Sequence, residues 1–291
     1  MRQDLLVEPI VVDRAITEAS FLATDAGLAV DRAVVLQNSN KLALRLLPCD
    51  LLARVAILGQ EVAELELDVA QRLADRDCPV ASPDARMAPR VFERDGFTVT
   101  FWTYYEQRPT NAGWPAIYAQ ALKRLHAGMQ GLDVATPHFV QRVAQAEALV
   151  GNRLETPALA ESDRELLLHS LASARSTIEN IGAPEQLLHG EPHRGNVLNT
   201  HRGALFIDFE TCCRGPIEYD VAHLPQEVSA HYSNVDANLL QECRRLVLAM
   251  VAAWRWDARD EFPNGRQAGQ DILTLLNEGP PWPPLGALDI D

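Results

Sequence analysis

Residues 187–196 read Leu-Leu-His-Gly-Glu-Pro-His-Arg-Gly-Asn, and the stretch that follows predicts a hairpin of two short strands, 197–200 and 204–207, ended by Asp208. Antiparallel partners in such a ladder lie about 5 Å apart. The hairpin is nearly symmetric about its turn, so folding it places the Asn196 amide opposite the Asp208 carboxylate. Two oxygen ligands at that separation suit magnesium, which completes its shell with water and phosphate oxygens.

Glu191 lies five residues before Asn196, in a loop that Gly190 and Pro192 make irregular. A carboxylate beside a metal–phosphate site can orient a hydroxyl nucleophile and accept its proton. Phosphoryl transfer depends mainly on positioning and on charge neutralisation. The order of base, metal-binding amide and metal-binding carboxylate therefore predicts phosphoryl transfer to a hydroxyl group.

The strings H-G-E-P-H-R-G-N, I-D-F-E and G-P-I-E-Y-D occur in this order between residues 189 and 220. They resemble the H-G-D-x-H-x-x-N string, the I-D-F/W string and the downstream aspartate of the aminoglycoside phosphotransferase and choline kinase family of small-molecule kinases. The resemblance implies that Glu191 is the catalytic base and that Asn196 and Asp208 bind magnesium. Three further residues would hold the catalytic loop in shape, namely His189, His193 and Asp220.

The same resemblance extends more weakly into the first third of the chain, where it implies a nucleotide site. Residues 36–45 take the place of the hairpin that covers the phosphates, with Ser39 and Asn40 in its turn where a glycine-rich loop is absent. Arg54 takes the position of the basic residue that grips the α- and β-phosphates, and arginine replaces the more usual lysine. Glu66, on the next predicted helix, would be its ion-pair partner.

A hinge for adenine is implied at residues 101–106, which include Thr103 and Tyr104. Residues 122–126 resemble the L-x-x-L-H helix of the family. The resemblance covers roughly residues 30–225 and is most specific over residues 187–220.

One departure from the family pattern affects the chemistry, because Glu191 stands where the family carries aspartate. The extra methylene extends the carboxylate by roughly 1 Å, and a misplacement of that size can cost about 10²-fold in rate. The sequence leaves three hypotheses: an active kinase, a nucleotide-binding pseudoenzyme, and a different enzyme class on the same fold. No role is assigned to Glu210 in any of them.

Hydrophobic periodicity predicts an α+β chain. The predicted strands lie in 33–47, 51–58, 91–102, 197–200 and 204–207, and the predicted helices in 59–75, 113–129, 139–151, 161–180 and 239–256. This order predicts an N-terminal lobe with an antiparallel sheet plus one helix and a mainly helical C-terminal lobe. The family resemblance implies that these lobes form a two-lobed protein-kinase-like fold. We expect a nucleotide-binding lobe over 1–104 and a catalytic and acceptor-binding lobe over 105–291.

Composition excludes several classes of protein. The formal net charge of -14 and the pI near 5.0 argue against nucleic acid and anionic membranes as partners. The odd number of cysteines, five, argues against a disulfide framework and favours a cytoplasmic protein. Neither the phosphate loop of P-loop proteins nor the G-x-S-x-G string of common hydrolases is present.

These observations predict an O-phosphotransferase that depends on ATP, or GTP in its place, and on Mg²⁺. The expected acceptor is a small hydroxylated molecule, with an aminoglycoside or another antibiotic among the candidates. The alternative is a nucleotide-binding pseudokinase with little or no activity.

Overall fold

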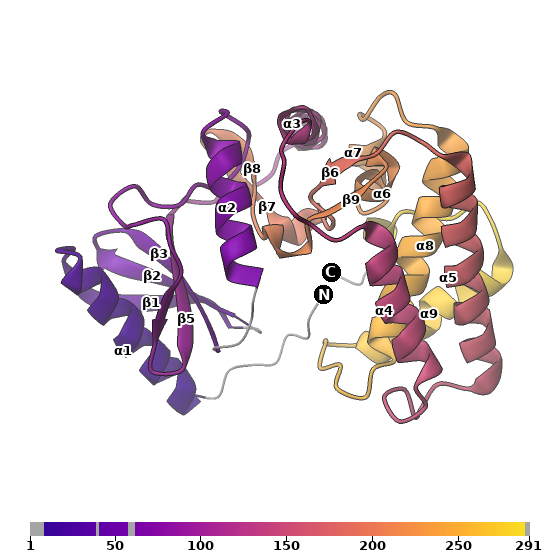
Figure 1. The fold of residues 1–291 in the computed structure, drawn as a ribbon, viewed down its shortest axis with the longest axis horizontal. Helices are drawn as coiled ribbons and strands as arrows, with labels where there is room; N and C mark the ends of the chain where they lie inside the picture. The colour runs from indigo at the N-terminus through magenta and orange to yellow at the C-terminus, as the bar shows by residue number, and fades with distance from the viewer. Residues whose placement is uncertain (1–8, 39–40, 58–61, 289–291) are drawn as a thin grey trace. The chain divides into compact units, whose positions relative to one another are not determined.

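The computed structural model describes residues 9–38, 41–57 and 62–288 (Figure 1). The chain forms two compact units. The sheet unit takes residues 2–109 and 198–210, and the helical unit takes residues 110–197 and 211–291. The predicted division at residues 104 and 105 stays a prediction.

A five-stranded antiparallel sheet is the body of the sheet unit. Its strand order is β1-β2-β3-β5-β4, with β1 at Val30–Asn38, β2 at Leu42–Pro48, β3 at Leu51–Ile57, β4 at Phe92–Arg94 and β5 at Phe97–Thr103 (Figure 1). The turn between β4 and β5 consists of Asp95 and Gly96, both with positive φ (46° and 81°). This conformation matches the tight hairpin turn that an Asp-Gly pair favours.

One face of the sheet packs against α1 (Pro9–Asp25). Alternate residues of β2 and β3 are fully buried there, and α1 contributes Ala15, Ala19 and Ala23, each with no exposed surface. The sequence analysis did not predict α1. Its fully buried positions are alanines at every fourth residue, and the larger Val11, Val12, Ile16 and Leu22 beside them are only partly buried. The fully buried stripe therefore lacks the large apolar residues that indicate an amphipathic helix.

The other face carries the charged residues. Arg54 lies between the buried Ala53 and Val55, so its side chain leaves the opposite face of β3. There it contacts Glu66 of α2 (Val62–Ala74), the helix predicted for residues 59–75.

The hairpin of β7 (Val197–Thr200) and β8 (Gly203–Phe206) belongs to the sheet unit from Leu198 onward. The Phe206 backbone N–H donates to the Pro79 carbonyl (2.8 Å), and the Phe206 carbonyl accepts from the Ala81 N–H (2.9 Å). These bonds fix the end of β8 and therefore the residues that follow it, including Asp208.

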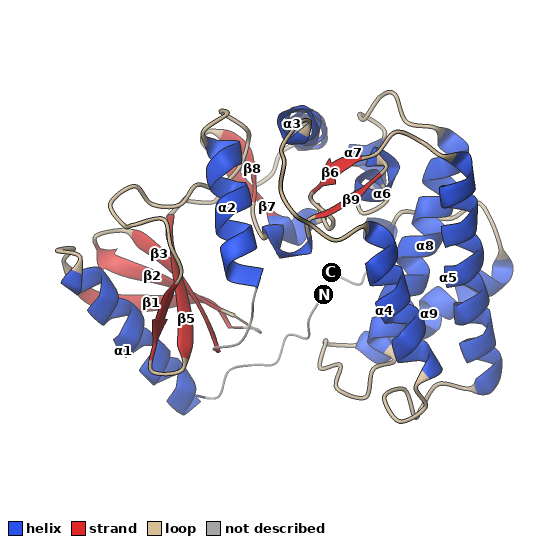
Figure 2. Cartoon of the chain, in the orientation of Figure 1, coloured by secondary structure: helices blue, strands red, loops and turns tan. Residues whose placement is uncertain are grey.

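The helical unit is built around a packed group of helices (Figure 2). Its elements are α3 (Trp114–Met129), α4 (Phe139–Gly151), α5 (Glu161–Ile181), β6 (Gln186–Leu188), β9 (Cys213–Gly215), α6 (Ile217–Val221), α7 (Gln226–Ser229), α8 (Ala237–Arg255) and α9 (Gly265–Glu278). The apolar faces of α4, α5, α8 and α9 form one core. No helix within the described ranges is long and apolar enough to cross a membrane.

The short strands β6 and β9 pair antiparallel, with Leu188 opposite Cys213. The chain leaves β6 directly into the loop that carries Glu191. The observed elements confirm the predicted α+β fold with an N-terminal antiparallel sheet and a mainly helical second part. Helix α9 was not among the helices that the sequence predicted.

Candidate active site

Asp220 holds the loop after β6 in place. Its side chain is fully buried and accepts hydrogen bonds from the backbone N–H groups of His189 (2.9 Å) and Gly190 (2.8 Å). His126 Nε2, on α3, lies 2.9 Å from the same carboxylate. Burial opposes ionisation of Asp220, but the hydrogen bonds from His126 and Gly190 lower its pKa below the ordinary value. A charged acceptor therefore fixes the backbone on the residues just before Glu191.

Gly190 is required by close backbone packing. Its φ is +93°, and a Cβ placed there would lie 2.0 Å from the carbonyl oxygen of Thr211. The Thr211 hydroxyl donates to the His189 carbonyl at 3.2 Å. The two segments of chain therefore touch backbone to backbone, which only glycine permits at this position.

Glu191 forms an ion pair with an arginine that lies 49 residues away in the sequence. Arg142, on α4, donates from Nη2 to Oε1 of Glu191 at 2.6 Å, and the two side chains are 14% and 12% exposed. Burial raises the pKa of Glu191, but nearby positive charges, the Arg142 guanidinium among them, outweigh it and lower the pKa below the ordinary value. The carboxylate is thus ionised and held from one side.

Asn196 lies in a single turn of 3₁₀ helix, Arg194–Asn196, capped by His193. The His193 Nδ1 accepts from the Gly195 N–H at 3.1 Å, and the Asn196 Nδ2 donates to the Glu191 carbonyl at 3.0 Å. The second bond fixes the amide and turns its oxygen, the atom a metal can use, away from that carbonyl. The structure therefore brings together the helical-unit residues that the sequence predicted: Glu191, Asn196, His189, His193 and Asp220.

In the sheet unit, two cations and three carboxylates form a connected cluster. Arg54 contacts Glu66 and donates from Nη2 to Asp208 Oδ1 at 2.8 Å. The Lys41 ammonium donates to Glu210 and lies 3.6 Å from Glu66 and 3.8 Å from Asp208. Burial lowers the pKa of Arg54, but Glu66 and Asp208 together raise it above the ordinary value. The guanidinium stays charged and is aimed between two acids.

The backbone at Asp208 is unusual, because φ is +67° in a residue other than glycine. Non-glycine residues in this left-handed region are uncommon, although aspartate is enriched among them, and they cluster at functional sites. The carboxylate is 27% exposed and is the most accessible of the three acids in the cluster. It is the acid in this cluster best placed to reach a ligand.

The remaining predicted nucleotide residues give a mixed result. Ser39 and Asn40 lie outside the described residues. The Thr103 N–H is committed to the Ser82 carbonyl at 3.0 Å, and the Tyr104 ring lies 3.9 Å below the Arg45 guanidinium. Their role in holding adenine stays a prediction.

The sequence analysis missed three charged residues of the site: Lys41, Arg142 and Glu210. Lys41 directly follows the predicted phosphate-covering turn, so its position was a usable signal. Glu210 is two residues from Asp208. Residues two apart can point to the same side of an extended chain, so this spacing was also a usable signal. Nothing local marks Arg142, because its partner is far along the chain.

The residues that suit a metal divide between the units. Asn196 belongs to the helical unit, and Asp208 belongs to the sheet unit. Both side chains offer oxygen, which magnesium prefers, and their joint role in binding magnesium stays a prediction. Within the described ranges no three His, Cys, Asp or Glu side chains form a metal-binding group.

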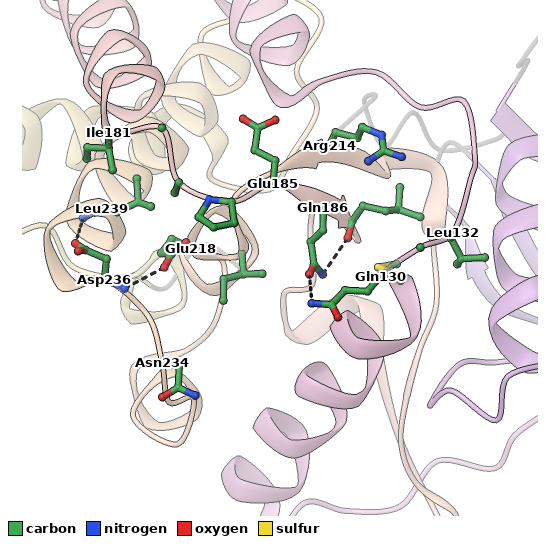
Figure 3. A pocket seen from close by; sticks show the side chains of 17 residues that line it. Gln130, Leu132, Ile181, Glu185, Gln186, Arg214, Glu218, Asn234, Asp236 and Leu239 are labelled. Carbon is green, nitrogen blue, oxygen red and sulfur yellow. Dashed lines mark hydrogen bonds between the residues drawn. The ribbon is translucent and has the colours of Figure 1, made fainter.

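A separate cavity of about 790 Å³ lies within the helical unit (Figure 3). It is lined by the end of α3, the segment from α5 to β6 and the start of α8, and Gln130 donates to Gln186 across it at 3.2 Å. Near α8, the backbone N–H of Asp236 donates to the buried Glu218 at 3.0 Å. The lining does not include Glu191 or Asn196, so this cavity is distinct from the candidate active site.

These features together define a protein-kinase-like fold, and three solved structures of small-molecule kinases share it. The amicoumacin kinase hAmiN has a TM-score of 0.72 at 14% identity, covering 95% of this chain and 98% of that one. Choline kinase LicA from Streptococcus pneumoniae has a TM-score of 0.67 at 14% identity, with coverage of 92% and 100%. Aminoglycoside 2'-phosphotransferase-IIIa has a TM-score of 0.66 at 16% identity, with coverage of 91% and 98%.

The family assignment comes from the sequence itself. The model of the phosphotransferase enzyme family, APH, matches residues 34–263. The chain therefore belongs to this family, as the strings around Glu191 and Asp208 predicted. A search of curated protein sequences found no match. Family and fold together support a small-molecule phosphotransferase.

Proposed function

We propose that this protein transfers the γ-phosphoryl group of ATP to a hydroxyl group of a small molecule, in a reaction that requires Mg²⁺. The observation that carries the proposal is the contact of Arg54 with both Glu66 and Asp208. It joins a phosphate-binding cation, its supporting acid and a metal-type carboxylate in one cluster. The amicoumacin kinase structure contains AMP-PNP and Ca²⁺, and that of spectinomycin phosphotransferase contains ADP, which supports a nucleotide and a divalent cation here.

Each half of the site has its own task. Arg54 and Lys41 bind phosphate oxygens of the nucleotide. These oxygens compete for the two cations with the carboxylates that contact them in this structure. Asn196 and Asp208 would hold magnesium, which neutralises phosphate charge when bound. Glu191 orients the acceptor hydroxyl and accepts its proton.

The acceptor we propose is a small hydroxylated molecule, with an aminoglycoside or another antibiotic as candidates. The neighbours named above act on chemically different acceptors, so fold alone does not choose among them. An acceptor screen that follows ATP consumption identifies the compound class. Replacement of the base, Glu191→Gln, should abolish the acceptor-dependent part of that consumption.

The first test of the proposal is calorimetric titration of ATP with and without magnesium. We expect Mg²⁺-dependent binding that weakens about 10-fold or more in Asp208→Ala, since one lost charge-assisted contact costs this much. Asp208→Asn separates loss of charge from loss of the Arg54 contact, and the exposed Asp75→Ala is the matched control. Binding that is indifferent to magnesium and to Asp208, or absent for both ATP and GTP, contradicts the proposal.

A pseudoenzyme is the second candidate, and one observation favours it: the carboxylate in the base position is already engaged by Arg142. This hypothesis expects ATP binding without turnover in the presence of any acceptor. The Glu191→Gln comparison decides between the two, because only an active enzyme loses turnover in that variant.

A further inference from the structure

We propose that Arg142 is a positioning residue, which sets the longer side chain of Glu191 where a catalytic carboxylate has to stand. This inference rests on the proposed function. It addresses the departure noted in the sequence, namely a glutamate in a position for which the family uses aspartate. Arg142 acts through Glu191, and no contact with nucleotide or acceptor is assigned to it.

The pair joins two anchored segments of the helical unit. Helix α4 is fixed by Phe139, Val143 and Ala146, which are at most 1% exposed in the core. The backbone of Glu191 is fixed on both sides, because its N–H donates to His189 Nδ1 (3.4 Å) and its carbonyl accepts from Asn196 Nδ2 (3.0 Å). Neither end of the ion pair can follow the other if the contact is lost.

Within this frame the side chain of Glu191 is the adjustable part. A glutamate has one more rotatable bond than an aspartate, so its carboxylate reaches more positions from the same backbone. The bond from Arg142 Nη2 to Oε1, at 2.6 Å between two mostly buried side chains, selects one of them. Charge-assisted hydrogen bonds of this length are among the strong ones in proteins.

The contact with Arg142 depends on the length of the side chain at position 191. Shortening Glu191 to aspartate withdraws the carboxylate by roughly one bond length, which takes it out of hydrogen-bond range of Arg142. Arg142 should therefore matter to catalysis only when residue 191 is glutamate. A residue that merely stabilises α4 would matter equally in both backgrounds.

The experiment measures the slow hydrolysis of Mg-ATP by the purified full-length protein, with water as the acceptor and phosphate release as the readout. The variants are Arg142→Gln, Glu191→Asp and the double variant. The matched control is Arg175→Gln, which breaks a half-buried Arg175–Glu147 pair of the same unit, 3.0 Å long. The KM for ATP and the melting temperature are measured for each variant.

We expect Arg142→Gln to lower kcat by about 10- to 100-fold, the loss that a carboxylate misplaced by about 1 Å produces. The KM for ATP should stay within about twofold of the wild-type value, because Arg142 contacts Glu191 and is assigned no contact with the nucleotide. In the Glu191→Asp background the same substitution should cost less than about threefold, since the pair is already broken. Arg175→Gln should leave kcat unchanged.

Two further measurements keep the test decisive if Arg142→Gln lowers stability. Arg142→Lys retains a cation and should recover part of kcat. Free guanidinium added to Arg142→Ala at millimolar concentration should restore turnover several-fold in the glutamate background and leave the aspartate background unchanged.

The outcomes separate the inference from the proposed function. An active wild type whose kcat is unchanged by Arg142→Gln, or whose losses add independently in the double variant, overturns the inference alone. A wild type with no more turnover than Glu191→Ala, both with water and with every acceptor of the screen, refutes the proposed function, and the inference falls with it.

Discussion

Replacing Gly190 by alanine should damage both the fold of the helical unit and its chemistry. The new Cβ would lie 2.0 Å from the Thr211 carbonyl oxygen, whereas ordinary contact begins near 3.4 Å. Two backbone segments must therefore separate by about 1.4 Å, because neither atom is at the end of a flexible side chain. The displaced segment is the one that Asp220 binds and that continues directly into Glu191.

The magnitude follows from two separate costs. An alanine at positive φ costs about 1–2 kcal/mol in any setting. The backbone clash adds to it, for a total of roughly 3–4 kcal/mol, at the upper end of single-substitution effects. Turnover should fall by more than about 100-fold, since the displacement exceeds the 1 Å that has this effect on a catalytic group.

Gly182→Ala is the matched control. Gly182 also has a positive φ, +62°, in the same unit, but a Cβ there meets nothing within 4 Å. It should show the conformational cost alone and keep full turnover. Urea unfolding followed by tryptophan fluorescence suits the comparison, because four of the five tryptophans lie in the helical unit. If the two variants match in stability and ATP turnover, the argument from backbone contact is wrong.

Three further outcomes are expected. Asp220→Asn should destabilise the helical unit by about 3 kcal/mol, because it removes the buried charge that three donors face; urea unfolding measures this, and Asp271→Asn, at an exposed position of the same unit, should have almost no effect. Glu66→Gln should weaken ATP binding roughly 10-fold by calorimetry, since Arg54 loses its charged partner, and unchanged affinity would contradict the role of this pair. His223 gives a pH dependence: burial lowers its pKa to about 4 from an ordinary 6.5, so the unfolded chain binds a proton that the folded chain does not. Stability should therefore fall as the pH drops from 6.5 towards 4, by up to about 3 kcal/mol, and His223→Gln should flatten that fall; a parallel pH profile for the variant and the wild type would exclude this cause.

The sequence predicted best where periodicity and packing agree. Helix α4 was predicted over 139–151 and is observed at Phe139–Gly151. Its buried residues Phe139, Val143, Ala146 and Val150 recur at helical spacing and face one core. The hairpin strands around residue 202 were predicted for the same reason, since alternation and turn residues agree there.

The parts that the sequence did not predict depend on partners far along the chain. The fully buried residues of helix α1 are alanines, so its most buried stripe carries little hydrophobic signal. Arg142 is an ordinary helix arginine until α4 packs near the loop that holds Glu191. The ion pair of Arg54 and Glu66 could be predicted, because the family resemblance implies it and the two residues lie on consecutive predicted elements.

The division of the chain has a consequence for how the protein can be cut and how it is made. The backbone passes between the two units at three places, near residues 109–110, 197–198 and 210–211. During synthesis the first 109 residues leave the ribosome about 100 residues before Asp208, at roughly 5–20 residues per second. Asp208 and Glu210, two of the three acids that contact Arg54 and Lys41, are therefore synthesised several seconds after those cations. A fragment that ends at residue 109 should therefore have an exposed backbone edge at Pro79–Ala81 and two under-compensated buried cations, so the sheet unit cannot be prepared by simple truncation.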